Sequence, residues 1–245
     1  MAITASHDNQ LQLLELAQLD TKLIQLDHQR VAIPELKLIQ DLEIELGSIE
    51  LKIVAAQTEV SDLTQAQAKA ETDVEQVQTR IDKDQERLAA GTGNPKDLEN
   101  LQHELGTLAN RLRELEDVEL SVMQQLEDAQ SALADLENEK KLVTLKLVDT
   151  RKVFEAKLSE VEQSISAEQE SRKRITQTLP AELIDLYEKI RIDRGDVGAA
   201  LLTRGACQGC HLSLDATELN RIKDLADDVI VRCEECRRIL VRTKG

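Results

Sequence analysis

The chain has almost no aromatic residues. Phe154 and Tyr187 are the only two among its 245 residues, and it contains just three prolines and nine glycines. A globular core of this size normally draws much of its buried area from aromatic rings. No apolar run approaches the roughly 18 residues that a membrane span needs. These absences exclude collagen-like, disordered, disulfide-scaffold and membrane-spanning classes, and they argue against an ordinary globular domain.

What the chain does contain is aliphatic and charged. Charged residues make up 32% of the sequence, and the formal net charge is −16. Residues 172–245 hold 14 of the 31 Lys/Arg and 12 of the 47 Asp/Glu, so residues 1–171 hold 17 against 35. Aliphatic residues embedded in such a background are typical of long helices and coiled coils. The acidic first part would repel a phosphate backbone, so nucleic acid is expected, if anywhere, at the C-terminal third.

The first residues give no sign of export. Met-Ala-Ile-Thr-Ala-Ser has neither the basic region nor the apolar region of a secretory signal. We therefore expect a cytoplasmic protein with reduced thiols. In that compartment clustered cysteines indicate metal binding more than disulfides.

Apolar residues recur with a heptad period over two long stretches. From Leu42 to Leu88 the spacing alternates between four and three, and twelve of fourteen such positions are apolar. From Leu101 to Phe154 thirteen of sixteen are apolar at the same spacing. A four-three repeat sustained this long is the seam of a left-handed coiled coil. The sequence therefore predicts a mostly α fold built on two long helices.

Between the two repeats lies a helix-breaking cluster, residues 91–95. Gly91 or Gly93 suits the left-handed end of a helix, Asn94 suits a helix cap, and Pro95 suits the first helical position. Two helices joined by so short a connection are antiparallel neighbours. We therefore predict an intramolecular antiparallel coiled-coil hairpin over residues 1–180, with its tip at 91–95.

The hairpin's register follows from this tip. Opposed residues should have numbers that add up to about 186, which sets Gln67 against Glu119 as a polar layer that fixes the pairing. Pro34 should break the first helix. At the same level the second helix takes two steps of four, from Thr150 to Leu158, so we expect a joint there.

Some aliphatic residues lie off the seam. Ile44, Leu51, Leu142 and Leu145 could cover a third helix or a second subunit. The sequence leaves monomer and homodimer both open.

The pattern changes after Leu179-Pro180, which ends the second arm. Residues 181–198 are expected to form a short helix and a connector, and residues 199–245 a small β domain with strands near 199–203, 229–232 and 239–242. This domain holds all four cysteines, as two Cys-x-x-Cys pairs. Two such pairs supply the tetrahedral sulfur set that Zn²⁺ prefers, and metal binding would supply the folding free energy of so small a domain. The sequence thus predicts a C4 zinc ribbon whose ligands are Cys207, Cys210, Cys233 and Cys236.

Two other interpretations of the cysteines exist. Each Cys-x-x-Cys pair could carry out thiol–disulfide exchange. The run from Cys207 to His211 also spells the attachment motif of c-type haem. The matching second pair and the absence of an export signal favour zinc over both.

The coiled coil joined to this cysteine pattern, with the segment from Asn94 to Leu105, resembles the bacterial C4-type zinc-ribbon family once known only as a domain of unknown function. The resemblance covers nearly the whole chain. Family members usually place proline and glycine where this chain has Glu234 and Arg237. The resemblance implies links to nucleic-acid binding, and to alternative sigma factors or export machinery as protein partners.

No catalytic constellation stands out: there is no phosphate-binding glycine loop, and His7, His28 and His103 are isolated. We expect a non-enzymatic adaptor in transcription or RNA-related regulation that contacts protein partners through the coil and through Asn94, Pro95 and Lys96 at the tip. A purely structural or oligomerising coiled coil is the alternative, and a thiol redox protein a more remote one. The ribbon could also bind nucleic acid, although acidic residues lie among its cations and it has no aromatic residue for stacking. The candidate phosphate contacts are Arg204, Arg221, Lys223, Arg232, Arg237, Arg238 and Arg242.

Overall fold

A computed structural model describes residues 3–91 and 93–242 of the chain. The chain divides into two compact units. We call Leu38–Arg151 the hairpin unit, and Met1–Lys37 together with Lys152–Gly245 the ribbon unit.

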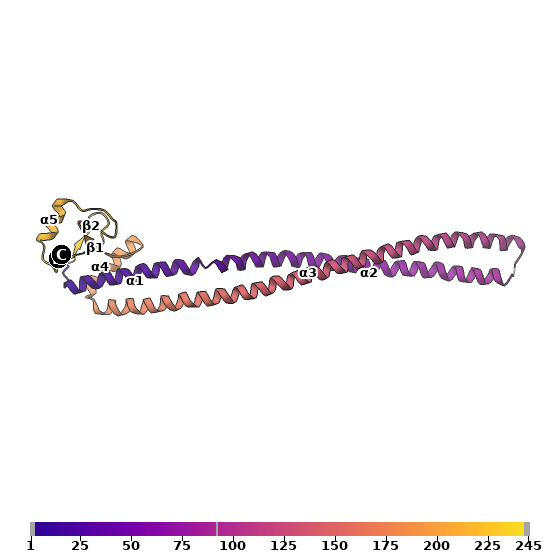
Figure 1. Cartoon of the computed structure of the whole chain (residues 1–245), viewed down its shortest axis with the longest axis horizontal. Helices are drawn as coiled ribbons and strands as arrows, with labels where there is room; N and C mark the ends of the chain where they lie inside the picture. The colour runs from indigo at the N-terminus through magenta and orange to yellow at the C-terminus, as the bar shows by residue number, and fades with distance from the viewer. Residues whose placement is uncertain (1–2, 92, 243–245) are drawn as a thin grey trace. The chain divides into compact units, whose positions relative to one another are not determined.

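The fold is mostly α, as predicted. Helices α1 (His7–Val31), α2 (Pro34–Ala89), α3 (Pro95–Thr178) and α4 (Ala181–Arg194) precede a small C-terminal region that contains the strands. Within the hairpin unit α2 and α3 run side by side in opposite directions (Figure 1). In the described part of the chain no helix combines the length and the apolar content that a membrane span needs.

The seam of the hairpin lies where the heptads place it. Between Leu42 and Leu88 all fourteen seam positions are buried or half-buried, and the only other residues there that are not exposed are Gly47 and Asp73. The same holds for the sixteen positions from Leu101 to Phe154, with Glu104 and Ala109 as the only additions. The coiled coil is therefore confirmed at the level of single residues.

Ion pairs join the two arms across the seam. Lys140 Nζ lies 2.9 Å from Glu50 Oε1, and Arg80 pairs with Glu104. The polar layer differs from the expectation. Gln67 donates to Glu71 Oε1 of its own helix at 2.8 Å rather than to Glu119. The half-buried amide is satisfied one turn along α2, so it does not need a partner on the other arm.

The tip is made by the residues that the sequence points to. Gly91 is in the left-handed conformation with φ 62°, and Pro95 is the first residue of α3. Asn94 Oδ1 accepts a hydrogen bond from Asp97 N at 2.9 Å and so caps the helix. Thr92 lies outside the described residues. Asn94 and Pro95 therefore have a structural role in starting α3, in addition to any contact with a partner.

Only one arm is interrupted at the expected joint. Helix α1 ends at Val31 and α2 begins at Pro34, whereas α3 continues through that level as one helix of 84 residues. Its non-exposed positions do change step there, from Thr150 to Phe154 to Leu158. A stutter is absorbed by a small change in supercoil and needs no break in the helix.

The ribbon is a four-stranded sheet with one short helix. Its strands are β1 (Ala199–Thr203), β2 (Ala206–Cys207), β3 (Val231–Arg232) and β4 (Ile239–Arg242), and they lie in the order β2-β1-β4-β3. The central pair, β1 and β4, is parallel. Helix α5 (Ala216–Asp224), which lies between the cysteine pairs, and β2, which ends at the first cysteine, were not expected from the sequence.

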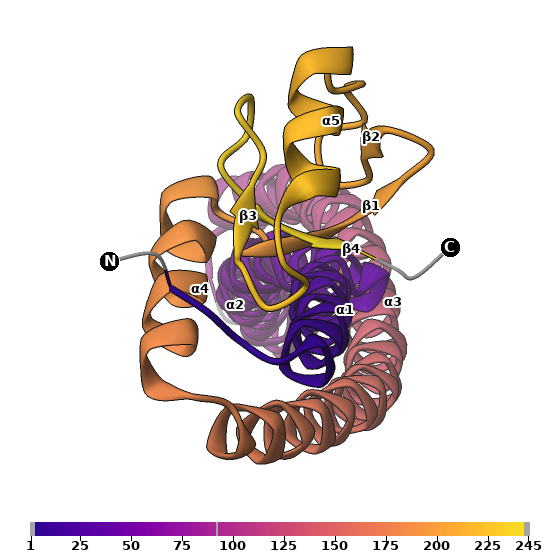
Figure 2. The ribbon, with the colours of Figure 1, turned by 90° about the vertical axis from the view of Figure 1, so that its left-hand side faces the viewer.

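Each face of the sheet is covered by a different core. Ala199 and Ile239 face a cluster formed with α1 and α4 that includes Leu13, Leu183 and Tyr187. Their neighbours Ala200 and Leu240 face the cysteines and α5. In Figure 2 the strands accordingly lie between α1 and α5.

The N-terminal segment also joins the ribbon. Ala5 N donates to Asp228 O at 2.8 Å, and Thr4 forms a β-bridge with Val229. Gln10, which is 1% exposed, donates to the carbonyls of Ala5 and Asp227. Residues more than 200 positions apart are thus held together, a contact that no local pattern in the sequence indicates.

Candidate metal centre

The four cysteines come from two tight turns at one end of the sheet. Their Sγ atoms all lie within 4.8 Å of one another. Cys207 Sγ is 3.8 Å from Cys236 Sγ, and Cys210 Sγ is 3.9 Å from Cys233 Sγ. Each turn therefore contributes two sulfurs to a single cluster, and Cys207, Cys233 and Cys236 are buried.

These distances fit a tetrahedral zinc site. A tetrahedron with Zn–S bonds of ~2.3 Å has sulfurs about 3.8 Å apart. A disulfide needs its sulfurs at about 2.05 Å, so the cross-pair separations are those of metal ligands and not of oxidised thiols. The residues present thus fit Zn²⁺ in both donor type and spacing.

The two cysteine turns have the same backbone geometry. His211 N donates to Cys207 O at 2.7 Å, and Arg237 N donates to Cys233 O at 2.9 Å. His211 and Arg237, each directly after the second cysteine of its pair, have φ of 61° and 64°. Arg237 therefore adopts the left-handed conformation for which a glycine is usual, at a cost of roughly 1 kcal/mol. The missing glycine does not change the turn.

Burial disfavours free thiolates in this cluster. It raises the pKa of Cys207 to about 12 and also raises the pKa of Cys233. At Cys236 burial acts in the same direction, but hydrogen bonds from Arg238 and Cys233 outweigh it and lower the pKa to about 7. Protonated thiols are poor nucleophiles, so burial disfavours thiol exchange at Cys207 and Cys233, whereas the lowered pKa of Cys236 does not. A bound divalent cation would instead compensate the charge of four thiolates.

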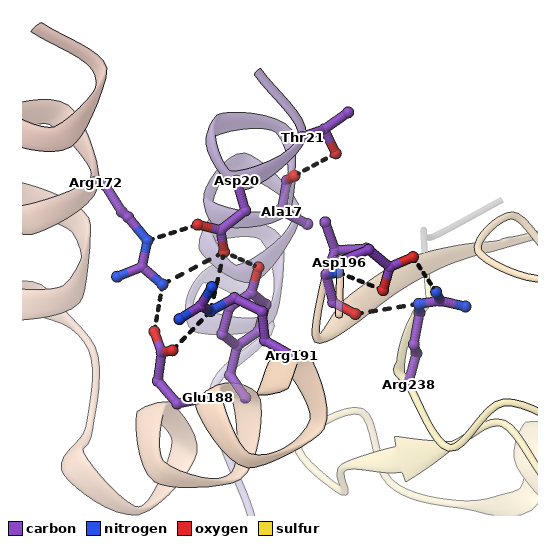
Figure 3. Close-up of polar contacts among 10 residues, drawn as sticks. Ala17, Asp20, Thr21, Arg172, Glu188, Arg191, Asp196 and Arg238 are labelled. Atoms are coloured by element: carbon purple, nitrogen blue, oxygen red, sulfur yellow. Dashed lines mark hydrogen bonds and ion pairs between the residues drawn. The ribbon is translucent and has the colours of Figure 1, made fainter. Parts of the chain in front are cut away.

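Arg238, which follows the second cysteine turn, holds the first cysteine turn and the connector after α4. Its guanidinium donates to Gly209 O at 3.0 Å in the first turn. It also donates to Val197 O at 3.1 Å in the connector, and it pairs with Asp196 (Figure 3). The residue is 7% exposed. A Cβ added at Gly209 would lie 2.8 Å from Arg238 Cδ, which explains a glycine there. Arg238 was expected among the phosphate contacts, but these bonds occupy its guanidinium.

Other cations of that set also have structural partners. Arg242 donates to four carbonyl oxygens around the end of α5, those of Ile222, Leu225, Ala226 and Val229. Arg221 makes two hydrogen bonds of 2.6 Å to Glu218. Arg232 Nε donates to Arg237 O at 3.1 Å, although its side chain stays exposed.

Three of the seven predicted cations remain exposed without such anchoring bonds in the part of the chain that the structure describes: Arg204, Lys223 and Arg237. Arg204 and Arg237 lie in turns with positive φ. Lys223 lies in the last turn of α5. Arg221 and Arg232 are exposed as well, so the buried Arg238 and the half-buried Arg242 are the two members of the set whose side chains the fold encloses.

A polar cluster that sequence analysis missed ties α1, α3 and α4 together beside the sheet (Figure 3). Asp20, only 3% exposed, accepts a hydrogen bond from Arg172 Nε at 2.6 Å and one from Tyr187 OH at 2.7 Å. Arg172 also pairs with Glu188, and Arg191 Nε lies 2.7 Å from Glu188 Oε2. Arg172 and Arg191 lower the pKa of Glu188 against the effect of its burial. The signal in the sequence was the single tyrosine: a buried tyrosine requires a polar partner.

Comparison with known proteins matches both parts of the chain. Residues 16–195 match the family described as CT398-like coiled coil hairpin domain, and residues 206–240 match the C4-type zinc ribbon domain. The uncharacterized protein Rv2229c of Mycobacterium tuberculosis is 31% identical over 236 residues, which cover 96% of each chain. An uncharacterized Mycobacterium leprae protein is 25% identical over 231 residues, covering 94% of this chain and 99% of its own.

Two solved structures share the fold. A Mycobacterium smegmatis protein superposes with a TM-score of 0.84 at 29% identity, covering 98% of this chain and 100% of its own. CT398 from Chlamydia trachomatis gives a TM-score of 0.67 at 20% identity, with 97% and 98% covered. The second similarity is one of fold alone.

Proposed function

This chain belongs to the CT398-like coiled coil hairpin domain family and ends in a C4-type zinc ribbon, and we propose that it acts as a non-enzymatic adaptor in the cytoplasm. In this proposal Cys207, Cys210, Cys233 and Cys236 hold Zn²⁺, which keeps the ribbon folded. The hairpin and its tip then contact protein partners. The observation that carries the proposal is the cysteine cluster, because four thiolates complete a tetrahedral shell. No coordination position is then left for a substrate, so the metal has a structural role.

The way the ribbon is attached supports a role in presentation. The sheet shares one of its faces with α1 and α4, so the metal-bound part is packed onto helices and not tethered by a free linker. A folded ribbon that is packed on α1 and α4 offers a binding partner a surface of defined shape. Because the cysteines cover the opposite face of the sheet, losing the metal would expose that face and loosen the whole ribbon.

Protein is favoured over nucleic acid as the partner. Most of the candidate phosphate contacts are held by backbone carbonyls or carboxylates, and the described exposed surface of the hairpin is rich in acidic side chains. Like charge repels a phosphate backbone. Lys96 at the tip is exposed, whereas Asn94 and Pro95 also serve to begin α3.

Affinity capture from native lysate with zinc-loaded full-length protein tests the proposal. Three baits are compared: wild type, Lys96→Glu at the tip, and the triple variant Arg204→Glu/Lys223→Glu/Arg237→Glu on the ribbon. A nuclease-resistant protein that wild type retains and one variant loses about tenfold would support an adaptor. Nuclease-sensitive capture that only the ribbon variant loses would instead assign nucleic acid. A bait that enriches nothing over a zinc-free, unfolded control would count against both.

A further inference from the structure

Helix α2 carries an aliphatic face that the hairpin leaves uncovered. Ile44, Leu51 and Val54 are 73%, 75% and 61% exposed. Ile44 and Leu51 lie two turns apart at the heptad position furthest from the seam, so the partner arm cannot cover them. A single exposed aliphatic residue is ordinary, but three on one side of a helix within three turns indicate a contact surface.

Small residues lie between these three. Gly47 and Ser48 have no large side chain to fill the surface between Ile44 and Leu51, and the small residue Ala55 follows Val54. Gly47 is in the interior of a regular helix, where glycine is less stable than alanine. A Cβ added there would meet no atom within 4 Å. Packing inside the hairpin unit therefore does not require this glycine, whereas the close approach of another backbone would.

Two charges flank the face with opposite sign. Glu45 and Lys52 are both exposed, each one residue after an exposed aliphatic. In this stretch Glu43 pairs with Arg151 and Glu50 pairs with Lys140. Glu45 and Lys52 form no ion pair with other residues of the ranges 3–91 and 93–242.

We propose that this face binds the same face of a second copy of the chain, with the two α2 helices antiparallel. A two-fold axis beside Ser48 pairs residues whose numbers add up to about 96. It places Ile44 against the partner's Leu51 and Glu45 opposite the partner's Lys52, and each contact occurs twice. The face is complementary to itself in charge, which is what a two-fold interface requires.

The alternatives are less compatible with the charges. A parallel pairing would place the Glu45 and Lys52 side chains of the two copies on opposite sides of the contact, so neither would meet the opposite charge of the partner. Helix α3 has its own exposed aliphatic residues, Leu142 and Leu145. They lie next to Lys141 and Lys146, which carry the same charge, so this face lacks the charge complementarity of the α2 face. It therefore serves as a matched control surface.

Sedimentation velocity of the zinc-loaded full chain over a range of concentrations tests the proposal. The small contact area predicts a dimer with a dissociation constant in roughly the micromolar range. Glu45→Lys and Lys52→Glu should each weaken the dimer about tenfold, and the double variant should restore it to within about threefold of wild type. A chain that is monomeric up to about 200 µM would overturn the proposal. So would a dimer that Leu145→Glu disrupts and Leu51→Glu does not.

Two further variants distinguish an interface from a change in folding. Gly47→Leu should raise the melting temperature, because it improves helix propensity without a clash, yet weaken the dimer at least tenfold. Ser48→Cys should form a disulfide-linked dimer with itself under mild oxidation, whereas Gln65→Cys, which is exposed on the same helix, should not. If both cysteines cross-link equally, the two-fold axis is not at Ser48.

Discussion

Ile239 and Leu240 are adjacent in β4, yet each is buried in a different core, and both are 0% exposed. Ile239 packs with Tyr187 and the other core residues of α1 and α4. Leu240 packs with Cys207, Cys233 and Cys236. One strand therefore links the metal centre to the helices, because alternate side chains of a strand point to opposite faces of its sheet.

Shortening these two side chains should have different consequences. Ile239→Ala and Leu240→Ala should each lower the free energy of unfolding by about 2–4 kcal/mol, since both remove fully buried methyl groups. Only Leu240→Ala should also weaken zinc binding, by roughly tenfold, because it packs on the ligands. Competition with a chromogenic chelator measures the affinity. Equal losses of zinc affinity in both variants would show that the two cores are not separate.

Arg242 should be a structural residue and not a phosphate contact. Arg242→Ala should lower the free energy of unfolding by about 2–4 kcal/mol, because four carbonyls around the end of α5 lose their donor. Arg232→Ala removes a single bond from an exposed side chain and should cost less than about 1 kcal/mol. Urea unfolding followed by circular dichroism compares the two. A neutral Arg242→Ala variant would contradict the assignment.

Tyr187 should stay protonated at alkaline pH for as long as the ribbon unit is folded. Burial, followed by the charge and hydrogen bond of Asp20, raises its pKa far above the usual value of 10. The stability that this contributes is complete below pH 10 and is lost as pH rises further, because only the unfolded state then ionises. Since the chain has one tyrosine and no tryptophan, absorbance at 295 nm reports this group alone. A tyrosinate signal that titrates near pH 10 in folded protein would contradict the buried contact.

Asp84 should destabilise the hairpin. It occupies a seam position at 6% exposure, and its Oδ2 accepts no hydrogen bond from any residue that the structure describes. Its ion pairs to Arg80 and Arg87 are long, at 3.8 and 3.5 Å. Asp84→Leu should therefore raise the free energy of unfolding by about 1 kcal/mol or more, whereas the exposed Asp82→Leu should not. Thermal unfolding of the two variants gives the comparison, and a destabilised Asp84→Leu would show that the carboxylate is needed at this level.

The coiled coil was predictable to single residues because its rule is local. A helix repeats every 3.6 residues, so the position of an apolar residue in the heptad gives the face of the helix on which it lies. Two other local rules also held. The preference of proline for the first helical position located Pro95 at the start of α3, and a short run of β-type residues located the strand at 239–242. The heptad rule failed for Gln67, since a side chain can choose between a partner on its own helix and one across the seam, and the heptad does not distinguish them.

The ribbon was predictable in its cysteines and not in its packing. Two Cys-x-x-Cys pairs specify the cluster, whereas Arg238 resembles any surface arginine until Gly209 and Val197 are seen beside it. The bridge from Thr4 to Val229 joins opposite ends of the chain. Contacts of this kind depend on the tertiary fold, which a one-dimensional pattern does not encode.

Zinc K-edge absorption spectroscopy, with metal analysis of the same sample, tests the central claim most directly. The account predicts one zinc per natively purified chain, bound by four sulfur atoms at ~2.3 Å. It also predicts that Cys207→Ser and Cys233→Ser each lose that spectrum together with the folded ribbon. Well-folded protein without bound metal, or zinc held by nitrogen and oxygen in place of the four sulfurs, would contradict it.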